Sequence, residues 1–439
     1  MNNWSRRLLA LGLLAALPLG AEIRSLTILH TNDLHARLSP LDNGHGGFAR
    51  LAAVIQRERA HCLDCILLNA GDLVQGTPVS TIFHGLPIFE IANFFHYDAA
   101  TLGNHEFDYG WMQVQKFIGT ANYPIVSANI VGADGQLLTA KPYVVLTVNG
   151  LRVGVIGAMT EDLHDLSTSK LLQQWHTMPV FATVRKYATD LRNQTDLLVL
   201  LAHITGEEEQ QFLAAAPDIP VFVTGHLHNG LSNAVTHDGR SLVRVKSYGE
   251  ELGRLELRVD TLRKAPIGWA WKRIPITADG PAPVAEIANQ VKRWEGEVSK
   301  QVDVPLAISR HRFDNAGVKL LMERAMCEET GADFAWINKG GVRDGLPEGQ
   351  LLVRHIWNIM PFDNRIVLGK FKGRDLPRTV LGQRTIEPGR EYTLAVSDFT
   401  AANQSAAEQL QTTGLVFAGD GGLLRDVLVD WFRKKKVIE

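Results

Sequence analysis

Short aliphatic runs alternate with longer amphipathic stretches through the N-terminal part of the chain. The runs have the length and the Leu, Ile and Val content of buried strands, and they lie at residues 26–30, 65–69, 123–126, 153–156, 197–201 and 221–223. Helical patterns lie between several of them, as at residues 48–59 and 180–192. Because strands that alternate with helices form a sheet covered by helices, the sequence predicts a layered α/β fold.

Polar residues follow directly after the predicted strands. They lie in five segments, residues 32–35, 71–72, 103–108, 203 and 225–228. Ligands of α/β sheets bind in the loops beyond the carboxyl ends of the strands. We therefore expect these five segments to meet at one site.

The residue types in these segments predict a pair of metal ions. Imidazole binds zinc, iron and related metals, and carboxylate and amide oxygens add harder ligands, so the mixture suits a two-metal site. Seven side chains are candidates, too many for one tetrahedral ion: Asp33, His35, Asp72, Asn104, His203, His226 and His228. Asp72 is central in the order of motifs, and we expect its carboxylate to bridge both ions. Two ions about 3.5–4 Å apart lower the pKa of bound water, so the nucleophile would be a metal hydroxide.

His105 and Asp108 lie in the segment Gly-Asn-His-Glu-Phe-Asp at residues 103–108. On a turn or at a helix start, the Asp108 carboxylate can orient the His105 imidazole. The protonated ring would stabilise transition-state charge or assist the leaving oxygen, an effect of about 10²- to 10⁴-fold. The alternative is that Asp108 only caps a helix at residues 109–118.

Together these motifs resemble the 5'-nucleotidase family within the calcineurin-like metallophosphoesterases. The resemblance extends from about residue 24 to 435, and the matching stretches are residues 29–35, 47–51, 69–72, 101–108, 223–226 and 247–255. It implies a four-layered α/β/β/α domain with two metal ions, followed by a smaller α/β substrate-binding domain.

The resemblance also implies a division of the ligands. By position, one ion would be held by Asp33, His35, Asp72 and His228, and the other by Asp72, Asn104, His203 and His226. His105 and Asp108 would be the catalytic dyad. His228 stands where many members have Gln or Asn, whereas Gly-His-x-His is frequent in the wider superfamily.

The C-terminal part carries a second set of matches. Residues 338–343 resemble the family's NGGGIR segment, and residues 361–364 resemble its PFGN segment. The resemblance implies substrate contacts from Arg310, Asn338, Arg343, Phe362 and Phe399. An Arg fork suits phosphate or carboxylate, and aromatic rings stack on a nucleobase. On residue type alone, these would be ordinary surface Arg and core Phe residues.

One departure from the family weakens the expectation of ribose binding. After the second Phe the family usually carries GGDG, whose Asp holds the ribose hydroxyls, whereas Phe399 is followed by Thr-Ala-Ala-Asn-Gln-Ser-Ala-Ala. Residues 419–422, Gly-Asp-Gly-Gly, have a sequence similar to GGDG but lie about twenty residues later in the chain. We expect them to start the last helix.

The order of motifs predicts four segments. Residues 1–21 would be a signal peptide, 22–280 the catalytic domain, 281–305 a linker helix and 306–439 the substrate-binding domain. Residues 277–283 are turn-like, and 284–302 have helical periodicity. In the last segment we expect strands at 366–368 and 392–396 and a helix at 423–434 that ends in a basic stretch.

The first residues predict export. Arg6 and Arg7 precede an apolar stretch at residues 8–19, and Ala21 offers a cleavage site, so the mature chain would start near Glu22 and be periplasmic or secreted. An uncleaved anchor is the alternative, although the stretch is short for a span of about 20 residues. Residues 5–9 also approach a twin-arginine signal, with the general export route as the other possibility.

The chain has three cysteines. Cys62 and Cys65 have CxxC spacing, and no second CxxC completes a zinc site. In an oxidising compartment we expect a local disulfide, with free thiols or a redox function as alternatives. Cys327 lies among apolar residues at helical spacing and is expected to be a buried free thiol.

Composition limits the partners and, with the motifs, the function. A hydrophobic content of 45% and a net charge of -2 describe a soluble globular protein with no electrostatic footprint for nucleic acid. We predict a periplasmic phosphohydrolase with two divalent ions (Zn, Mn, Co or Mg) that releases phosphate from 5'-nucleotides or related small phosphoesters. A 2',3'-cyclic-nucleotide phosphodiesterase or a UDP-sugar pyrophosphatase could use the same centre. A nucleotide-binding protein without turnover is disfavoured, because all seven ligands and the dyad are present.

Overall fold

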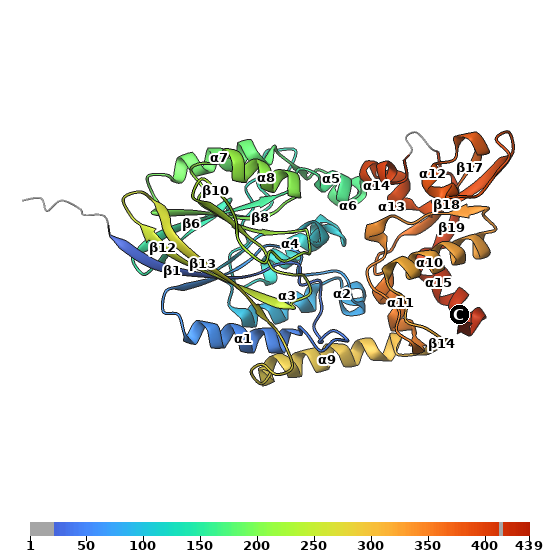
Figure 1. Cartoon of the computed structure of the whole chain (residues 1–439), viewed down its shortest axis with the longest axis horizontal. Coiled ribbons are helices and arrows are strands. Elements are labelled where there is room, and N and C mark those ends of the chain that lie inside the picture. Colours follow the sequence, from blue (N-terminus) through green and yellow to red (C-terminus); the bar gives the residue numbers. More distant parts are fainter. Residues whose placement is uncertain (1–21, 412–415) are drawn as a thin grey trace, which may run out of the picture.

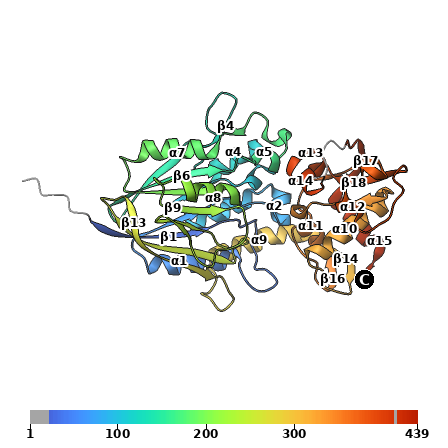
Figure 2. The same ribbon diagram turned by 45° about the horizontal axis from the view of Figure 1, so that its top comes forward.

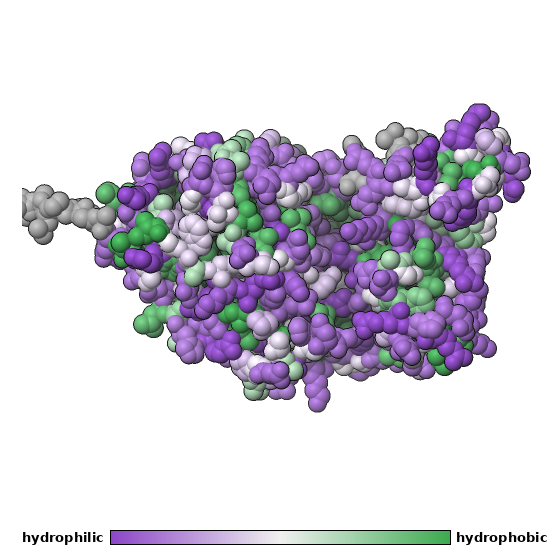
Figure 3. Space-filling view, in the orientation of Figure 1, coloured by the Kyte–Doolittle hydropathy of each residue, from purple (hydrophilic) through white to green (hydrophobic). Residues whose placement is uncertain are grey.

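The computed structural model describes residues 22–411 and 416–439 (Figure 1). The predicted signal peptide, with Arg6, Arg7 and Ala21, lies outside the described residues. Within the described ranges, no helix combines the length and the hydrophobicity that a bilayer crossing requires. The face seen in Figure 3 is mostly hydrophilic, with apolar residues in scattered groups.

Two β-sheets form the centre of the N-terminal part, as Figures 1 and 2 show. The first sheet has the strand order β13-β12-β1-β2-β3 and the second has β10-β11-β9-β8-β6-β5. The first contains β1 (Ile23–Thr31), β2 (Cys65–Asn69), β3 (Ala99–Ala100), β12 (Glu251–Asp260) and β13 (Ala265–Pro275). The second contains β5 (Tyr143–Val148), β6 (Leu151–Met159), β8 (Leu197–His203), β9 (Val221–Gly225), β10 (Val235–His237) and β11 (Arg240–Val243). A short pair, β4 (Ile130–Val131) and β7 (His176–Thr177), lies apart from both.

Strand β8 shows why the fold has four layers. Leu197, Val199 and Leu201 point into a core shared with the first sheet. Leu198 and Leu200 point the other way, into a core with the helices on the outer face. Because successive side chains of a strand alternate between faces, a strand buried on both sides reads as a continuous apolar run.

Helices cover both outer faces (Figure 1). The first sheet is covered by α1 (Phe48–Ala60), α2 (Pro78–Phe83), α3 (Leu86–Ala92) and α4 (Trp111–Thr120), and the second by α7 (Val180–Leu191) and α8 (Gly206–Ala215). Two one-turn helices, α5 (Leu163–Leu166) and α6 (Ser169–Leu172), lie in the connection before α7. The predicted α/β/β/α layering is confirmed.

The helix α9 (Ala285–Val302) leads from the N-terminal part to a second unit (Figures 1 and 2). That unit has a three-stranded sheet ordered β16-β14-β20 and a four-stranded sheet ordered β15-β18-β17-β19. Its strands are β14 (Pro305–Ser309), β15 (Phe334–Ala335), β16 (Gly349–Leu352), β17 (Arg365–Lys372), β18 (Glu391–Ser397), β19 (Gly419–Leu423) and β20 (Val437–Ile438). Its helices are α10 (Asn315–Thr330), α11 (Val353–Ile359), α12 (Arg378–Leu381), α13 (Asp398–Ala402), α14 (Gln404–Gln409) and α15 (Leu424–Lys435). The domain boundaries at residues 280 and 305 stay predictions.

Two local expectations are wrong. Residues 123–126 form no regular strand: Ile125 and Val126 make only isolated bridges, to Ala100 and Lys141. Residues 419–422 belong to strand β19, which pairs with β17, and the last helix starts only after it.

The cysteines agree with two expectations and correct a third. Cys62 and Cys65 form a disulfide between the end of α1 and the start of β2. Cys327 is a free thiol on α10, but it is half-buried and not fully enclosed.

Candidate metal centre and catalytic site

The five polar segments meet at one edge of the two sheets. Residues 32–35 follow β1, residues 71–72 follow β2, and residues 103–108 follow β3 after a short turn. His203 is the last residue of β8, and residues 226–228 follow β9. Because β1, β2 and β3 are parallel, as are β6, β8 and β9, their carboxyl ends lie on the same side.

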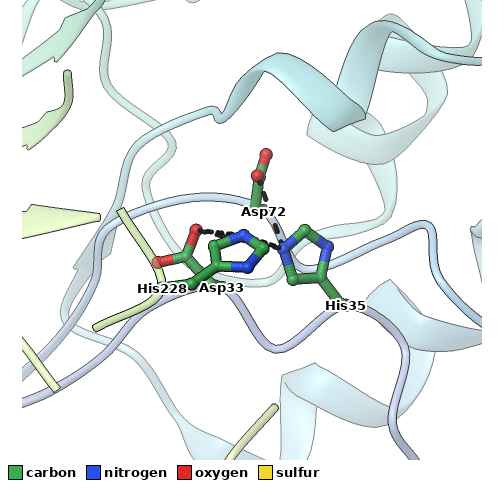
Figure 4. A group of neighbouring side chains, drawn as sticks. All are labelled: Asp33, His35, Asp72 and His228. Atoms are coloured by element: carbon green, nitrogen blue, oxygen red, sulfur yellow. Dashed lines mark hydrogen bonds and ion pairs between the residues drawn. The ribbon is translucent and has the colours of Figure 1, made fainter. Parts of the chain in front are cut away.

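Four of the candidate ligands form one compact group, shown in Figure 4. One ligand atom from each of Asp33, His35, Asp72 and His228 lies within 4.8 Å of the others. The Nε2 atoms of His35 and His228 are 2.8 Å apart. Asp72 Oδ2 is 3.7 Å from His35 Nε2, and Asp33 Oδ1 is 3.7 Å from His228 Nε2.

The other candidates lie directly beside this group. Asn104 Oδ1 is 3.2 Å from His203 Nε2 and 3.0 Å from His226 Nδ1. Asp72 Oδ2 is also 3.2 Å from His203 Nε2. Asp72 therefore stands between the two groups, as a carboxylate that bridges two ions would.

The backbone at these residues is strained. Five of the seven candidates have left-handed conformations, with φ of 50° at Asp33, 47° at His35, 54° at Asp72, 84° at His226 and 59° at His228. Such conformations cost about 1–3 kcal/mol each and persist only where the surroundings enforce them, typically at functional sites.

Gly103 permits the close approach of two of the loops. A Cβ at this position would lie 2.0 Å from Asp72 Oδ1. The same carboxylate oxygen accepts a 3.0 Å hydrogen bond from the His105 backbone N–H. The turn at residues 103–105 thus wraps around the Asp72 side chain.

Burial keeps three of the imidazoles neutral. The pKa of His35 lies well below its usual value because of burial and the neighbouring His228. Burial and His203 lower the pKa of His226 to about 3, and burial and Arg343 lower the pKa of His228 to about 3. Neutral imidazole is the form that binds metals.

Asp72 and His203 form a buried charge pair. Burial alone would raise the pKa of Asp72, but His203 and His105 hold it well below its usual value. Burial alone would lower the pKa of His203, but Asp72 raises it to about 10. Burial raises the pKa of Asp33 to about 6. A divalent cation beside Asp72 would replace the proton on His203, because metal binding releases protons from ligands.

The donor set fits divalent cations. Among the described residues, His35 Nδ1 is buried without a hydrogen-bond partner, and the buried Asp72 Oδ2 has His203 Nε2, 3.2 Å away, beside it in an ion pair but no hydrogen bond of normal geometry. Buried polar atoms nearly always have a hydrogen-bond partner, so acceptors that lack a normal hydrogen bond in a cluster of His and Asp suit a cation as their partner. Imidazole, carboxylate and amide donors together suit a transition metal.

His105 and Asp108 are paired in the structure. His105 Nδ1 lies 2.8 Å from Asp108 Oδ2. Burial opposes the charged form of His105, but Asp108 and Asp72 raise its pKa above the usual value. The helix α4 begins at Trp111 with Gly110 as its N-cap, so the alternative that Asp108 caps this helix is wrong.

The second unit places part of its predicted substrate set over this centre. The Phe362 ring stacks beside His105, with ring centroids 6.0 Å apart. The Arg343 guanidinium lies 5.9 Å from the Phe362 ring, and its Nη2 is buried without a partner. Asn338 is buried at the start of the turn that leads to Arg343, and Phe399 is half-buried on α13. Among the described residues, no ring contact joins Phe399 to Phe362.

Arg310 is not brought to this site. Its side chain is 61% exposed and faces Glu439, 3.8 Å away, because the Arg310 backbone pairs with the last strand, β20. Arg312 instead lines a cavity of about 650 Å³ between the two units, together with Arg37, Tyr248 and Arg343.

Several residues at the site were missed by sequence reasoning. Glu106 is buried and accepts hydrogen bonds from the backbone N–H groups of Gly103, Asp72 and Leu73, at 2.5, 3.1 and 2.8 Å. Burial and Asp72 raise the pKa of Glu106 to about 7. Its position next to His105 in the same segment was the available signal.

Contacts between the two units lie beside the centre. Arg37 Nη2 donates to Asp344 Oδ2 at 3.0 Å, and the Arg37 guanidinium lies over the Tyr248 ring. Thr81 Oγ1 donates to the backbone oxygen of Pro361 at 3.1 Å. No local pattern in the sequence singled out Arg37 or Arg312.

Comparisons with known proteins match both parts of the chain. Residues 26–230 match the calcineurin-like phosphoesterase family, and residues 297–383 match the 5'-nucleotidase C-terminal domain. Protein 5NUC of Lutzomyia longipalpis is 30% identical over 419 residues, which cover 81% of this chain and 72% of that protein. Protein UshA of Yersinia enterocolitica is 24% identical over 427 residues, which cover 83% and 77%.

A solved structure shares the whole fold. The 5'-nucleotidase precursor from Thermus thermophilus superposes with a TM-score of 0.85 at 23% identity. The alignment covers 95% of this chain and 97% of that one. The shared fold therefore includes both units.

Proposed function

The chain belongs to the 5'-nucleotidase family within the calcineurin-like metallophosphoesterases, and we propose that it uses two divalent cations to release phosphate from 5'-nucleotides or related phosphoesters. It is a metal-dependent phosphoesterase. One observation carries the proposal. Seven candidate metal ligands and the His105–Asp108 pair lie close together, and Arg343 and Phe362 of the second unit lie next to them.

The metal assignment divides these ligands into two sets. One ion would be held by Asp33, His35, Asp72 and His228, and the other by Asp72, Asn104, His203 and His226. When bound, two cations would neutralise charge on the phosphoryl group and lower the pKa of an attacking water. The donor types suit Zn, Mn or Co better than Mg, because four of the seven are imidazoles.

His105 would handle the proton at the departing oxygen. Asp108 holds Nδ1, which leaves Nε2 as the proton donor to the substrate. Against the effect of burial, Asp108 and Asp72 raise the pKa of His105, which favours the protonated ring that a general acid requires. The Asn104 and His105 side chains project from one short turn, η2 (Asn104–Phe107), so metal binding and proton transfer would be set by one local structure.

The second unit would select the substrate. The unpaired Arg343 Nη2 suits a phosphate oxygen, and Phe362, with Phe399, offers aromatic faces to a base. Asn338 completes the proposed set at this site, whereas Arg310, which faces Glu439, is not part of it. Arg312 is a further candidate, because it lines the cavity that Arg310 does not reach.

The segment after Phe399 favours a second candidate class of substrate. No Asp stands where the family holds ribose hydroxyls, and the short helix α14 occupies the following residues. Substrates whose ribose hydroxyls are esterified, such as 2',3'-cyclic nucleotides, would therefore also suit the same centre. UDP-sugars, which keep a free ribose, would be a further candidate for the same metal chemistry.

We also propose that the protein acts in the periplasm or outside the cell. The predicted signal at residues 1–21 supports export. The Cys62–Cys65 disulfide suits an oxidising compartment.

The proposal is tested by measuring phosphate release from mononucleotides, cyclic nucleotides, nucleotide sugars and sugar phosphates, with Mn, Zn, Co and Mg supplied in turn. We expect metal-dependent release from at least one nucleotide, and its loss together with bound metal in Asp72→Asn and His226→Ala. A protein that binds two ions but hydrolyses no phosphoester would refute the catalytic proposal.

A further inference from the structure

A buried arginine makes hydrogen bonds to the loop that carries His226 and His228. Arg244 follows strand β11 and is 3% exposed. Its Nε donates to the backbone oxygen of Asn229 at 2.8 Å, and its Nη2 donates to Asn229 Oδ1 at 3.0 Å. The planar guanidinium of Arg244 therefore makes two hydrogen bonds to Asn229, the residue directly after His228.

The remaining nitrogen of the fork is tied to helix α8. Arg244 Nη1 forms an ion pair with Glu209, which is itself 4% exposed. The same Glu209 oxygen accepts a 2.6 Å hydrogen bond from Thr224 Oγ1, two residues before His226. Glu209 lies in the first turns of α8, which begins soon after His203. The network therefore connects three of the candidate histidines through their backbone segments.

The residues after Arg244 hold the other side of the centre. Val245 exchanges two hydrogen bonds with the Asn32 side chain, and Asn32 Nδ2 also donates to Asp33 Oδ2 at 2.6 Å. Ser247 donates its backbone N–H to the backbone oxygen of His228 at 3.2 Å. The segment 244–247 is therefore a common support for candidate ligands from two different loops.

The conformation of the loop explains why such a support is needed. Both His226 and His228 have positive φ, of 84° and 59°. Left-handed residues other than Gly relax unless the surrounding structure holds them. The two hydrogen bonds from Arg244 to Asn229 fix the backbone directly after His228.

We propose that Arg244 is a positioning residue for the metal centre: it fixes the 226–228 loop in its metal-binding shape by joining Asn229 to Glu209. The inference rests on the proposed metal assignment of His226 and His228. The hydrogen bonds of the Arg244 side chain go to Asn229 and Glu209, and among the described residues none goes to a candidate metal ligand. Residues that orient metal ligands typically change metal affinity by about 10- to 100-fold when they are removed.

The test is a calorimetric titration of the metal-free full chain with Mn²⁺. We expect Arg244→Met to bind at least one of the two ions about 10- to 100-fold more weakly than the wild type. Arg244→Lys should recover only part of the affinity, because an ammonium cannot reproduce the planar fork. Thermal unfolding without metal, recorded for each variant, gives the loss of stability separately.

Arg240→Met is the matched control. Arg240 lies on β11, is 5% exposed, and its side chain donates to the backbone oxygen of His237 and to Asp238. We expect this variant to lose stability but to keep wild-type Mn²⁺ affinity. An equal loss of affinity in both variants would overturn the proposal, because it would mean that removing any buried arginine on or directly after β11 has the same effect.

Wild-type affinity in Arg244→Met would also overturn it. If Arg244→Met does not fold, Asn229→Ala replaces it, because Asn229 is exposed and its truncation leaves the core intact. Wild-type affinity in Asn229→Ala would then count against the proposal. A wild-type chain that takes up no Mn²⁺, Zn²⁺ or Co²⁺ refutes the proposed function itself, whereas a wild type with two bound ions and an unaffected Arg244→Met refutes only this inference.

Discussion

Replacing Asp108 with Asn should slow turnover by about 10- to 150-fold and leave both metal ions in place. The hydrogen bond from His105 Nδ1 to Asp108 Oδ2 is 2.8 Å long and partly buried, with side chains 14% and 17% exposed. A hydrogen bond to a charged group contributes about 1.5–3 kcal/mol. If that contribution is made in the transition state, each 1.36 kcal/mol lost slows the reaction about tenfold.

The His105→Asn variant should lose more, about 10²- to 10⁴-fold, because the proton donor itself is removed. The double variant should be no slower than His105→Asn, since Asp108 acts only through the imidazole. The measurement is kcat for a small aryl phosphate, with bound metal determined in the same samples. His164→Asn is the control, because His164 is an exposed histidine that also lies beside an aspartate.

The pH dependence follows from the same pair. Asp108 and Asp72 raise the pKa of His105 despite its burial, so the ring keeps its proton to higher pH than a free histidine. Activity that needs protonated His105 falls as pH rises through this pKa. In Asp108→Asn the pKa is lower, so the alkaline fall in kcat should begin at lower pH. Two results would show that Asp108 does not act through His105. One is a loss of kcat in the double variant equal to the product of the two single losses, and the other is an alkaline fall of kcat in Asp108→Asn at the same pH as in the wild type.

Three further outcomes test other parts of the structure. Gly103→Ala should lose metal and about 1–3 kcal/mol of stability in thermal unfolding, because the new Cβ would lie 2.0 Å from Asp72 Oδ1; unchanged metal content would contradict this geometry. Phe399→Ala should raise KM for nucleotides and spare a small aryl phosphate, and an equal effect on both substrates would make Phe399 structural. Replacing Cys62 and Cys65 by Ser should lower the free energy of unfolding by about 2 kcal/mol in urea titration, given the short loop that they close; a value unchanged from the wild type would show that the disulfide contributes nothing.

The layered fold and the meeting of the candidate ligands could be predicted because the sequence patterns that indicate them are local. Each ligand segment directly follows a buried strand, as Asp33 follows β1 and His226 follows β9. The predicted strand at residues 123–126 failed because Pro124 has no N–H, so this segment pairs with Ala100 only through Pro124 O and Val126 N. An apolar run forms a regular strand only where a neighbouring strand can exchange hydrogen bonds with its backbone along the whole run.

Long-range contacts account for the other differences. Residues 419–422 read as a helix start, but Gly419 and Asp420 pair with Leu368 and Val367 of β17, which no local pattern reveals. Arg310 and Arg312 are the same residue type and lie two positions apart, so the sequence does not distinguish them. The backbone hydrogen bond from Arg310 to Ile438 turns Arg310 away, and Arg312 lines the cavity. Arg244 lies in no motif, since its importance comes entirely from Asn229 and Glu209.

The placement of Phe362 beside His105 brings the proposed substrate-binding residues of the second unit next to the proposed catalytic residues of the first. All candidate metal ligands and the dyad come from the N-terminal part, whereas Arg343, Phe362 and Phe399 come from the second unit. The two parts are joined near the centre by a few side-chain contacts, among them Arg37 with Asp344. Under the proposed function, substitutions at residues 398–409 would therefore change substrate binding and leave the candidate metal ligands in place. The absence of an Asp after Phe399 is a difference of this kind, and under the proposed function it would affect substrate binding and not the metal centre.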